Sequence, residues 1–365
     1  MRAQRLPRAR SVGSVGFVTA CEEADGVTFG GVERKRVRDA GLVEDAFDQS
    51  FVALGAGVGD GIHRMMMLHF VLLLALAAPP GRLVDVGGGR QMHIVCVGNG
   101  FPTVVFEAGG GEGWYTWAVV QDAISRNYRA CAYDRAGFAF SDERPGPRTV
   151  AGIVDDLHTL LHNAGEKPPY VMVGHSMGGE FVRGYAAAYP AEVAGMVLVD
   201  SSHEDDGTST LAPSIEAIRE QRRLALEEMR RSGKWKTMGF PDGLPRDVET
   251  LVTPLTATRK WWEARFAEGR MSDYHPSVPV ERRQLDIPLV VLTSTDASRP
   301  NSVPESDWKE WQQRHAREQD ELAMRSPRST HVLVSAGHYI QLEKPQLVID
   351  AIRQVACSVI ETSQR

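Results

Sequence analysis

The chain has 365 residues, of which 42% are hydrophobic and 24% are charged, and this composition excludes disordered, collagenous and coiled-coil proteins. Its 41 basic and 47 acidic side chains give a net charge of −6, which offers no counterion-release argument for a nucleic-acid partner. Four cysteines do not make a disulfide scaffold in a chain of this length, which fits two to three domains or one α/β domain with an insertion.

The segment 65–80 has the layout of a secretory signal, because Arg64 precedes a leucine-rich apolar run that ends in small residues. The run, Met65–Ala78, is shorter than the roughly 20 helical residues that cross a bilayer, so we predict no stable membrane span in the mature chain. We predict a secreted or periplasmic protein, and a buried helix in a cytoplasmic protein is the alternative. Residues 1–64 show no sustained periodicity, and we interpret them as a disordered or mis-assigned upstream segment.

From residue 82 onward, short apolar runs alternate with amphipathic stretches at helical spacing, and Gly87-Gly88-Gly89 marks a hairpin between the first two runs. The alternation predicts βαβ units, and therefore an α/β fold with a doubly wound, mostly parallel sheet covered by helices on both faces. The predicted strands are Arg82–Val86, Gln91–Val97, Thr103–Glu107, Tyr128–Tyr133, Tyr170–Val173, Val193–Val199, Ile287–Thr293 and His331–Ser335. The predicted helices are Trp117–Arg126, Val150–Asn163, Met177–Tyr189 and Leu347–Ile360.

Residues 201–286 interrupt this alternation, and we predict a helical cap there, inserted into a core formed by residues 81–200 and 287–365. One predicted helix has an apolar stripe formed by Ile215, Ile218, Leu226 and Met229, which recur at helical spacing. A second helix is indicated by the aromatic residues Trp261, Trp262 and Phe266. The aromatic residues have two interpretations, an apolar lid over an acyl pocket or the small core of the cap itself.

The segment Gly174–Gly178 has the pattern G-x-S-x-G, follows the predicted strand Tyr170–Val173 directly and opens a predicted helix. This strand–turn–helix context is typical of a nucleophile elbow, in which the glycines leave room for a sharp turn. The turn lifts Ser176 above the carboxyl edge of the sheet, where α/β sheets bind ligands. We therefore predict that Ser176 is a nucleophile.

A serine hydroxyl is a weak nucleophile and needs a base. Of the 11 histidines, His338 follows the last predicted strand beside a glycine, where a loop can lean over the sheet, and it is our candidate base. His175 belongs to the turn itself, and His203 and His331 are weaker candidates.

The base in turn needs a carboxylate that fixes its tautomer. Asp296 follows the strand that ends at Thr293 and gives the chain order serine, aspartate, histidine. Asp200 follows the strand Val193–Val199 in the same way and is the alternative acid, with Glu204 and Asp205 behind it.

Two backbone amides should receive the oxyanion of an acyl-transfer reaction. One is that of Met177, the residue after the nucleophile, and Gly110 in the glycine-rich loop 108–114 is the candidate for the other. A flexible loop is the alternative interpretation of these glycines. Metal-binding spacing is missing from the acidic stretch 203–206, and we predict neither a metal nor a cofactor.

Taken together, these motifs resemble the α/β-hydrolase superfamily. The segments that carry the resemblance are Val84–Gly88, Pro102–Gly109, Tyr133–Phe138, Gly174–Gly179, Gly337-His338 and Pro345. The resemblance extends from about residue 82 to the C-terminus and implies an eight-stranded sheet in the order 1-2-4-3-5-6-7-8. It also implies an antiparallel second strand and a helical cap between strands six and seven.

The resemblance carries the nucleophile to Ser176, the base to His338, the acid to Asp296 and the oxyanion donors to Gly110 and Met177. The chain departs from the family pattern at Ala139, where a glycine is usual, and at the long helical stretch Ser306–Arg325 between Asp296 and His338. The second departure puts Asp296 in doubt as the acid, and a placement on strand six, known in some lipase-like relatives, fits Asp200.

An aspartate at position 176 would have indicated an epoxide hydrolase or a dehalogenase, whereas a serine favours acyl transfer to water. We therefore predict an esterase whose partner is a small-molecule ester; an amidase or peptidase, and a slow-turnover ligand receptor, are the alternatives. The implied strand order makes the strands of Cys96 and Cys131 neighbours, and we expect two buried thiols there rather than a disulfide.

Overall fold

The computed structural model describes residues 10–11, 79–204, 212–269, 284–299 and 303–364. The predicted signal-like segment lies outside the described residues except for its last two prolines, and so does almost all of the segment before it. In the described part of the chain, no helix combines the length and the apolar character needed to cross a membrane.

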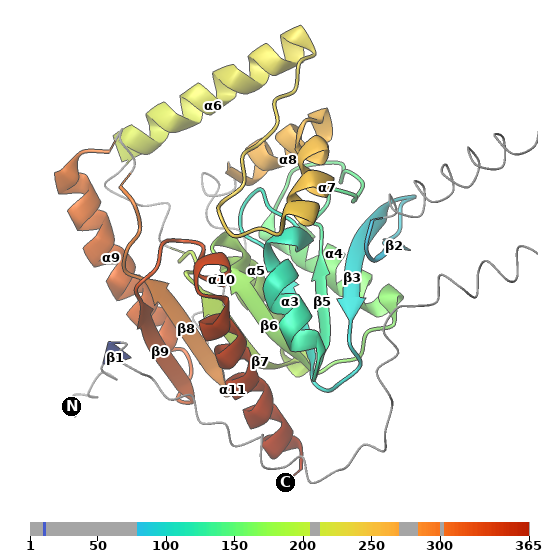
Figure 1. Ribbon diagram of the computed structural model, residues 1–365, viewed down its shortest axis with the longest axis vertical. Coiled ribbons are helices and arrows are strands. Elements are labelled where there is room, and N and C mark those ends of the chain that lie inside the picture. The colour runs from blue at the N-terminus through green and yellow to red at the C-terminus, as the bar shows by residue number, and fades with distance from the viewer. Residues whose placement is uncertain (1–9, 12–78, 205–211, 270–283, 300–302, 365) are drawn as a thin grey trace, which may run out of the picture. The chain divides into compact units, whose positions relative to one another are not determined.

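Among the described residues, nine strands form one sheet in the order β1-β9-β8-β7-β6-β4-β5-β3-β2, and all of them except β1 come from the part after residue 81 (Figure 1). The strands of this sheet are β1 (Arg10–Ser11), β2 (Arg82–Asp85), β3 (Gln91–Val97), β4 (Thr103–Glu107), β5 (Arg129–Tyr133), β6 (Tyr170–His175), β7 (Val193–Val199), β8 (Leu289–Ser294) and β9 (Ser329–Val334). Strand β3 runs antiparallel to both of its neighbours, β2 and β5, and every other pair is parallel. Strands β2 to β9 therefore have the predicted eight-stranded order, which is confirmed.

Helices cover both faces of this sheet (Figure 1). Helices α3 (Ala118–Ser125), α10 (Ile340–Glu343) and α11 (Pro345–Ser363) pack on one face, and α4 (Val150–Ala164), α5 (Met177–Ala188) and α9 (Glu305–Ala323) pack on the other. The described residues also include two short 3-10 helices, η1 (Trp114–Trp117) directly before α3 and η2 (Pro190–Glu192) directly before β7.

Alternation along the central strands explains why their sequences read as continuous apolar runs. Val171 and Val173 of β6 face the helices α3 and α11, whereas Tyr170 and Met172 face the helices α4 and α5. Both sets are fully buried, and each such side chain contributes about 1.5–3 kcal/mol by leaving water. The sheet is therefore a rigid support, and its carboxyl edge is where irregular backbone begins.

Between β7 and β8 the described residues form three helices: α6 (Ala212–Ser232), α7 (Arg246–Thr256) and α8 (Arg259–Gly269). Leu226 and Met229 of α6 are buried as their stripe predicts, whereas the side chains of Ile215 and Ile218 lie outside the described residues. Trp261 of α8 is also buried, and its ring lies edge-on to that of Phe138 with centroids 6.2 Å apart. This residue belongs to a small apolar core rather than to an open lid.

A buried ion-pair network joins α8 to the sheet. The Arg135 guanidinium donates to Glu107 on β4 at 2.7 Å and to Glu268 on α8 at 2.8 and 2.9 Å, and Arg148 lies 2.7 Å from Glu268. Burial alone would raise the pKa of Glu268, but the charges of Arg135 and Arg148 lower it to about 2. Both carboxylates are almost completely buried, so each depends on its arginine partners for compensation.

The strands β3 and β5 also carry a disulfide, between Cys96 and Cys131. The expectation of two separate thiols is therefore wrong. The two cysteines are direct partners in the antiparallel register, with their Cα atoms 4.1 Å apart, which brings their side chains together on one face. The strand order indicates that these strands are neighbours, but the register that aligns the cysteines appears only in the structure.

We predict that Arg135→Met lowers the free energy of unfolding by about 3–5 kcal/mol, because it leaves the buried carboxylate of Glu107 without its cation. Urea denaturation followed by tryptophan fluorescence measures the change. The matched control is Arg126→Met, whose partner Asp122 and own side chain are 74% and 71% exposed, and which should cost less than about 1 kcal/mol. Equal effects of the two substitutions would show that the buried network contributes little.

Candidate active site

The turn between β6 and α5 places Ser176 in a backbone conformation that residues with a side chain rarely adopt, with φ 51° and ψ −125°. Its two glycines are required by close packing. A Cβ atom on Gly174 would lie 2.6 Å from the carbonyl oxygen of Gly178, and one on Gly178 would lie 2.6 Å from that of Glu107. The G-x-S-x-G segment thus forms the tight turn that its sequence predicts.

Positive φ angles at non-glycine residues gather at the carboxyl edge of the sheet. In the described part of the chain they occur at Ala139, Ser176 and Asp200, which lie in the segments after β5, β6 and β7. Such conformations cost of the order of 1–3 kcal/mol each and persist where the surrounding structure fixes them. At Ala139, where the family usually has a glycine, φ is 37°, which explains the preference for glycine.

Parallel pairing of β6 with β7 brings Ser176 and Asp200 to the same place on this edge. His175 pairs with Val199, and the backbone N–H of Ser176 donates to the Val199 carbonyl at 3.1 Å. The N–H of Ser202 returns a hydrogen bond to the Ser176 carbonyl at 2.9 Å. The two functional side chains therefore start from adjacent, mutually hydrogen-bonded backbone.

His338 reaches this place from the loop after β9. Its Nδ1 lies 2.6 Å from Oδ2 of Asp200, and its carbonyl oxygen lies 3.0 Å from Nε2 of His175, the residue before Ser176. The rings of His338 and His175 are 4.7 Å apart. The side chain of His338 is 43% exposed, whereas that of Asp200 is 2% exposed, so the imidazole covers the carboxylate and meets solvent on its other side.

Asp200 is held by four hydrogen bonds. Ser294 donates its backbone N–H to Oδ1 and its hydroxyl to Oδ2, both at 2.9 Å, and Nε2 of His315 lies 3.2 Å from Oδ1. Burial opposes ionisation of this carboxyl, but hydrogen bonds and charges from His315 and His338 more than offset burial and hold the pKa of Asp200 well below its usual range. Asp200 is thus a buried, ionised carboxylate directed at an imidazole.

The prediction that Asp296 is the partner of His338 is wrong. Asp296 is exposed, and its carboxylate accepts hydrogen bonds from Ser335 Oγ at 2.6 Å and Thr295 Oγ1 at 2.9 Å. It lies two residues past the end of β8, whereas Asp200 directly follows β7, next to β6. The alternative acid, Asp200, is the one that the structure brings to His338.

The loop after β4 brings Gly110 against the first residue of α5. A Cβ atom on Gly110 would lie 3.5 Å from Sδ and Cε of Met177. Met177 begins the helix, so its N–H has no partner within the helix and points out of the helix start. The two residues predicted to supply the oxyanion donors therefore lie close together, at the turn that holds Ser176.

Two buried acids that the sequence analysis missed hold this loop. Glu112 accepts the N–H of Gly109 at 3.2 Å, and Glu268 of the inserted helix α8 accepts the N–H of Gly111 at 2.8 Å. The Arg135 guanidinium donates to the carbonyl oxygen of Gly109 at 2.6 Å. The amides on both sides of Gly110 are thus fixed by charged groups, which defines how the peptide at Gly110 is oriented.

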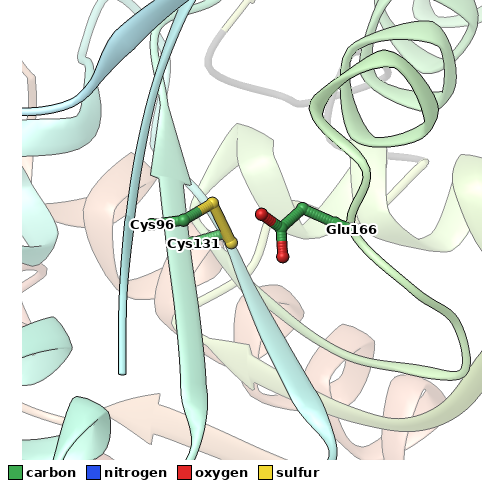
Figure 2. Close-up of side chains that lie close together, drawn as sticks. All are labelled: Cys96, Cys131 and Glu166. Atoms are coloured by element: carbon green, nitrogen blue, oxygen red, sulfur yellow. A yellow bond between two sulfur atoms is a disulfide. The ribbon is translucent and has the colours of Figure 1, made fainter. Parts of the chain in front are cut away.

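The residues Cys96, Cys131 and Glu166 are close enough together to suggest a metal site (Figure 2). Their donor atoms are already committed. The two sulfurs form the disulfide, and the Glu166 carboxylate accepts hydrogen bonds from the Arg129 guanidinium at 2.7 and 3.0 Å. The three residues therefore have a structural role, since the disulfide joins β3 to β5 and the Arg129–Glu166 contact joins β5 to the segment before β6.

Comparison with known sequences identifies the family of the chain. A profile of the Alpha/beta hydrolase family matches residues 94–351, which include all the strands from β4 to β9. The chain belongs to the alpha/beta hydrolase family. It therefore has the α/β-hydrolase fold, and the match covers the turn at Ser176 and the loop at His338.

Three of the chain's relatives have low sequence identity to it or match only part of its length. The uncharacterized protein YqjL of Bacillus subtilis is 26% identical over 263 residues, which cover 71% of this chain and 85% of that protein. The probable transporter efuK of Hormonema carpetanum is 39% identical over 129 residues, which cover 33% of this chain but only 18% of that relative. A thermophilic esterase from Thermogutta terrifontis matches with a TM-score of 0.56 at 23% identity, covering 77% of this chain and 99% of the esterase. At this identity the likeness shows the fold.

The backbone strain at Ser176 gives a prediction that needs no substrate. Ser176→Gly should be more stable than Ser176→Ala by about 1 kcal/mol or more, because glycine adopts a positive φ without cost and alanine keeps the Cβ atom. Urea denaturation of the two variants measures the difference. At Ser358, inside helix α11, the same comparison should have the opposite sign by about 1 kcal/mol. A less stable glycine variant at both positions would argue against strain at Ser176.

Proposed function

We propose that the chain is a serine hydrolase that cleaves carboxylic esters of small or apolar substrates through an acyl-enzyme intermediate. The observation that carries the proposal is the 2.6 Å contact of His338 with the buried carboxylate of Asp200, beside the strained turn of Ser176. A nucleophile, a base and a carboxylate that orients the base are the parts that acyl transfer requires.

In the proposed reaction, the Ser176 hydroxyl attacks the ester carbonyl carbon while Nε2 of His338 accepts the hydroxyl proton. Asp200 accepts the Nδ1–H of His338, which fixes the tautomer and stabilises the imidazolium that forms. The amides of Gly110 and Met177 receive the negative charge on the tetrahedral intermediate. The intermediate collapses to the acyl-enzyme as His338 returns the proton to the leaving alcohol, and water then repeats the sequence to release the acid.

Two features support a carboxylic ester as the substrate class. A serine stands where an aspartate would form the ester intermediate of an epoxide hydrolase, and a serine instead suits an acyl group. The segment between α6 and α7 supplies an apolar side chain near the loop that carries Gly110, since Phe240 packs edge-on against Tyr115 with ring centroids 5.3 Å apart. An amide or peptide substrate would use the same three side chains, and the choice is decided by comparing turnover of matched ester and amide substrates.

We also propose that the enzyme works outside the cytoplasm. The support is twofold: the signal-like layout of segment 65–80, and the disulfide between Cys96 and Cys131, a bond that persists in oxidising compartments. Fractionation of cells that produce the natural protein tests this placement. Recovery of the enzyme from the cytoplasm with Cys96 and Cys131 reduced would contradict it.

We predict that a fluorophosphonate labels the wild-type protein at Ser176, because the imidazole makes this hydroxyl reactive. Ser176→Ala should abolish the adduct and lower kcat for a chromogenic short-chain ester by at least about 10³-fold. Intact-protein mass spectrometry and steady-state kinetics give the two readouts. Steady turnover after the first product burst indicates an enzyme, whereas tight binding without turnover would indicate a ligand receptor and refute the proposed hydrolysis.

The two aspartates give a sharper test of the proposed triad. Asp200→Asn should lower kcat by about 10³–10⁴-fold, because the amide no longer favours the required tautomer of His338. Asp296→Asn should change kcat by less than about threefold, since this side chain is exposed and bonds to Ser335 and Thr295. Steady-state kinetics of both variants decide between them. A large loss with Asp296→Asn and a small one with Asp200→Asn would reverse the assignment.

A further inference from the structure

Helix α9 brings a second histidine to the carboxylate that faces His338. Nε2 of His315 lies 3.2 Å from Oδ1 of Asp200, while His338 occupies Oδ2. His315 is 8% exposed, and its ring stacks on Trp311 with a centroid distance of 4.8 Å and an interplanar angle of 8°. Trp311 in turn stacks on Trp308 at 4.5 Å. The ring of His315 is therefore fixed on one side by an aromatic stack and at its nitrogen by the carboxylate.

The same helix is attached to the backbone next to Asp200. One turn after His315, Gln319 donates its amide N–H to the carbonyl oxygen of Ser201 at 2.6 Å and accepts a hydrogen bond from Thr293 Oγ1 at 3.4 Å. The side chains of His315 and Gln319 are both buried. Helix α9 thus contacts the segment that carries Asp200 through two successive polar residues of its buried face.

Four further titratable groups on this side of the sheet, among the residues that the structure describes, interact with partners other than His315. On α9, Glu318 pairs with Arg314 at 3.2 Å, and Asp320 pairs with His331 of β9 at 3.0 Å. Past Asp200, His203 and Glu204 interact with each other and with Arg325. The charged group that His315 itself hydrogen-bonds is Asp200.

We propose that His315 is a positioning residue for the catalytic acid: it holds Oδ1 of Asp200 so that Oδ2 faces His338, and it limits how strongly Asp200 stabilises the imidazolium. This inference rests on the proposed serine hydrolase function and extends it to a residue on α9. Two hydrogen bonds to one oxygen, from Ser294 N–H and His315, stop the carboxylate from rotating about its Cβ–Cγ bond. They also share its negative charge, so less of the charge is available to His338.

The direction of the effect follows from this sharing of charge. When the donor at position 315 is removed, Asp200 attracts the proton on His338 more strongly, whether His315 is neutral or charged in the wild type. The imidazolium, which is inactive as a base, then persists to higher pH. The acid limb of the kcat/KM profile therefore moves to higher pH, and kcat falls because the carboxylate is held by one hydrogen bond fewer.

The experiment compares His315→Phe with His315→Gln. Phenylalanine keeps a flat ring against Trp311 but has no donor, whereas glutamine keeps an N–H donor near the position of Nε2. For His315→Phe we expect the acid limb to move up by about half a pH unit or more. We also expect kcat to fall about tenfold with KM changed less than twofold, as suits the loss of a hydrogen bond to a charged group. His315→Gln should restore the wild-type limb.

His331→Phe is the matched control, because it also exchanges a largely buried histidine for a phenylalanine but its nitrogens contact Thr293 and Asp320, and it should leave the limb in place. If His315→Phe does not fold, His315→Leu is the donor-free variant. An unchanged limb in the donor-free variant, or a glutamine variant no better than it, would overturn the proposal.

A readout independent of turnover keeps the two proposals separable. We expect the Nδ1 proton of His338 to give a downfield ¹H NMR signal, because Nδ1 lies 2.6 Å from a carboxylate oxygen. In the donor-free variant this signal should move, and in His315→Gln it should return toward the wild-type position. If Ser176→Ala keeps full activity, the serine hydrolase mechanism fails, whereas an unmoved His338 signal would refute the role of His315.

Discussion

The buried charge of Asp200 is the constraint on which the rest of the carboxyl edge depends. A carboxylate that is 2% exposed remains ionised only when donors replace the water it has lost, and here the donors come from three different elements. Ser294 belongs to β8, His315 to α9 and His338 to the loop after β9. The hydrogen bonds to this one carboxylate therefore fix three chain segments that lie far from Asp200 in the sequence.

Strain and charge are concentrated at the same edge, and each supports the other. Ser176 and Asp200 both have positive φ, and the backbone hydrogen bonds between their segments keep both conformations in place. A serine in an extended strand would point into the neighbouring side chains, whereas the turn exposes it above the sheet. The stability that the apolar strands supply is partly used here to hold a reactive geometry.

The inserted helices take part in this geometry through a buried ion pair. Glu268 of α8 accepts the N–H of Gly111, and it is itself held by Arg135, which also bonds to the carbonyl oxygens of Ala108 and Gly109. The orientation of the peptide at Gly110 thus depends on a helix about 160 residues later in the chain.

The sequence predicts whatever depends on local pattern and leaves open whatever depends on register and packing. Apolar runs predict all eight strands, and the G-x-S-x-G turn and the histidine after the last strand identify Ser176 and His338, because each signal lies within a few residues. Asp200 and Asp296 each follow a strand, and only their three-dimensional surroundings separate them. The disulfide is similar, because neighbouring strands follow from the family order but the pairing of Cys96 with Cys131 requires the register.

Helix α9 shows why the remaining part of the site was not apparent. Its buried face carries His315, Glu318 and Gln319 followed by Leu322, so it has helical spacing but not an apolar stripe. A search for apolar periodicity takes such a helix for a solvated one. The face is polar because it contacts the segment directly after β7, where a backbone carbonyl and a carboxylate need donors rather than methyl groups. A polar stripe at helical spacing, in a helix that precedes the proposed base His338, is therefore a signal of a buried polar edge, and it carries the same weight in sequence interpretation as an apolar stripe.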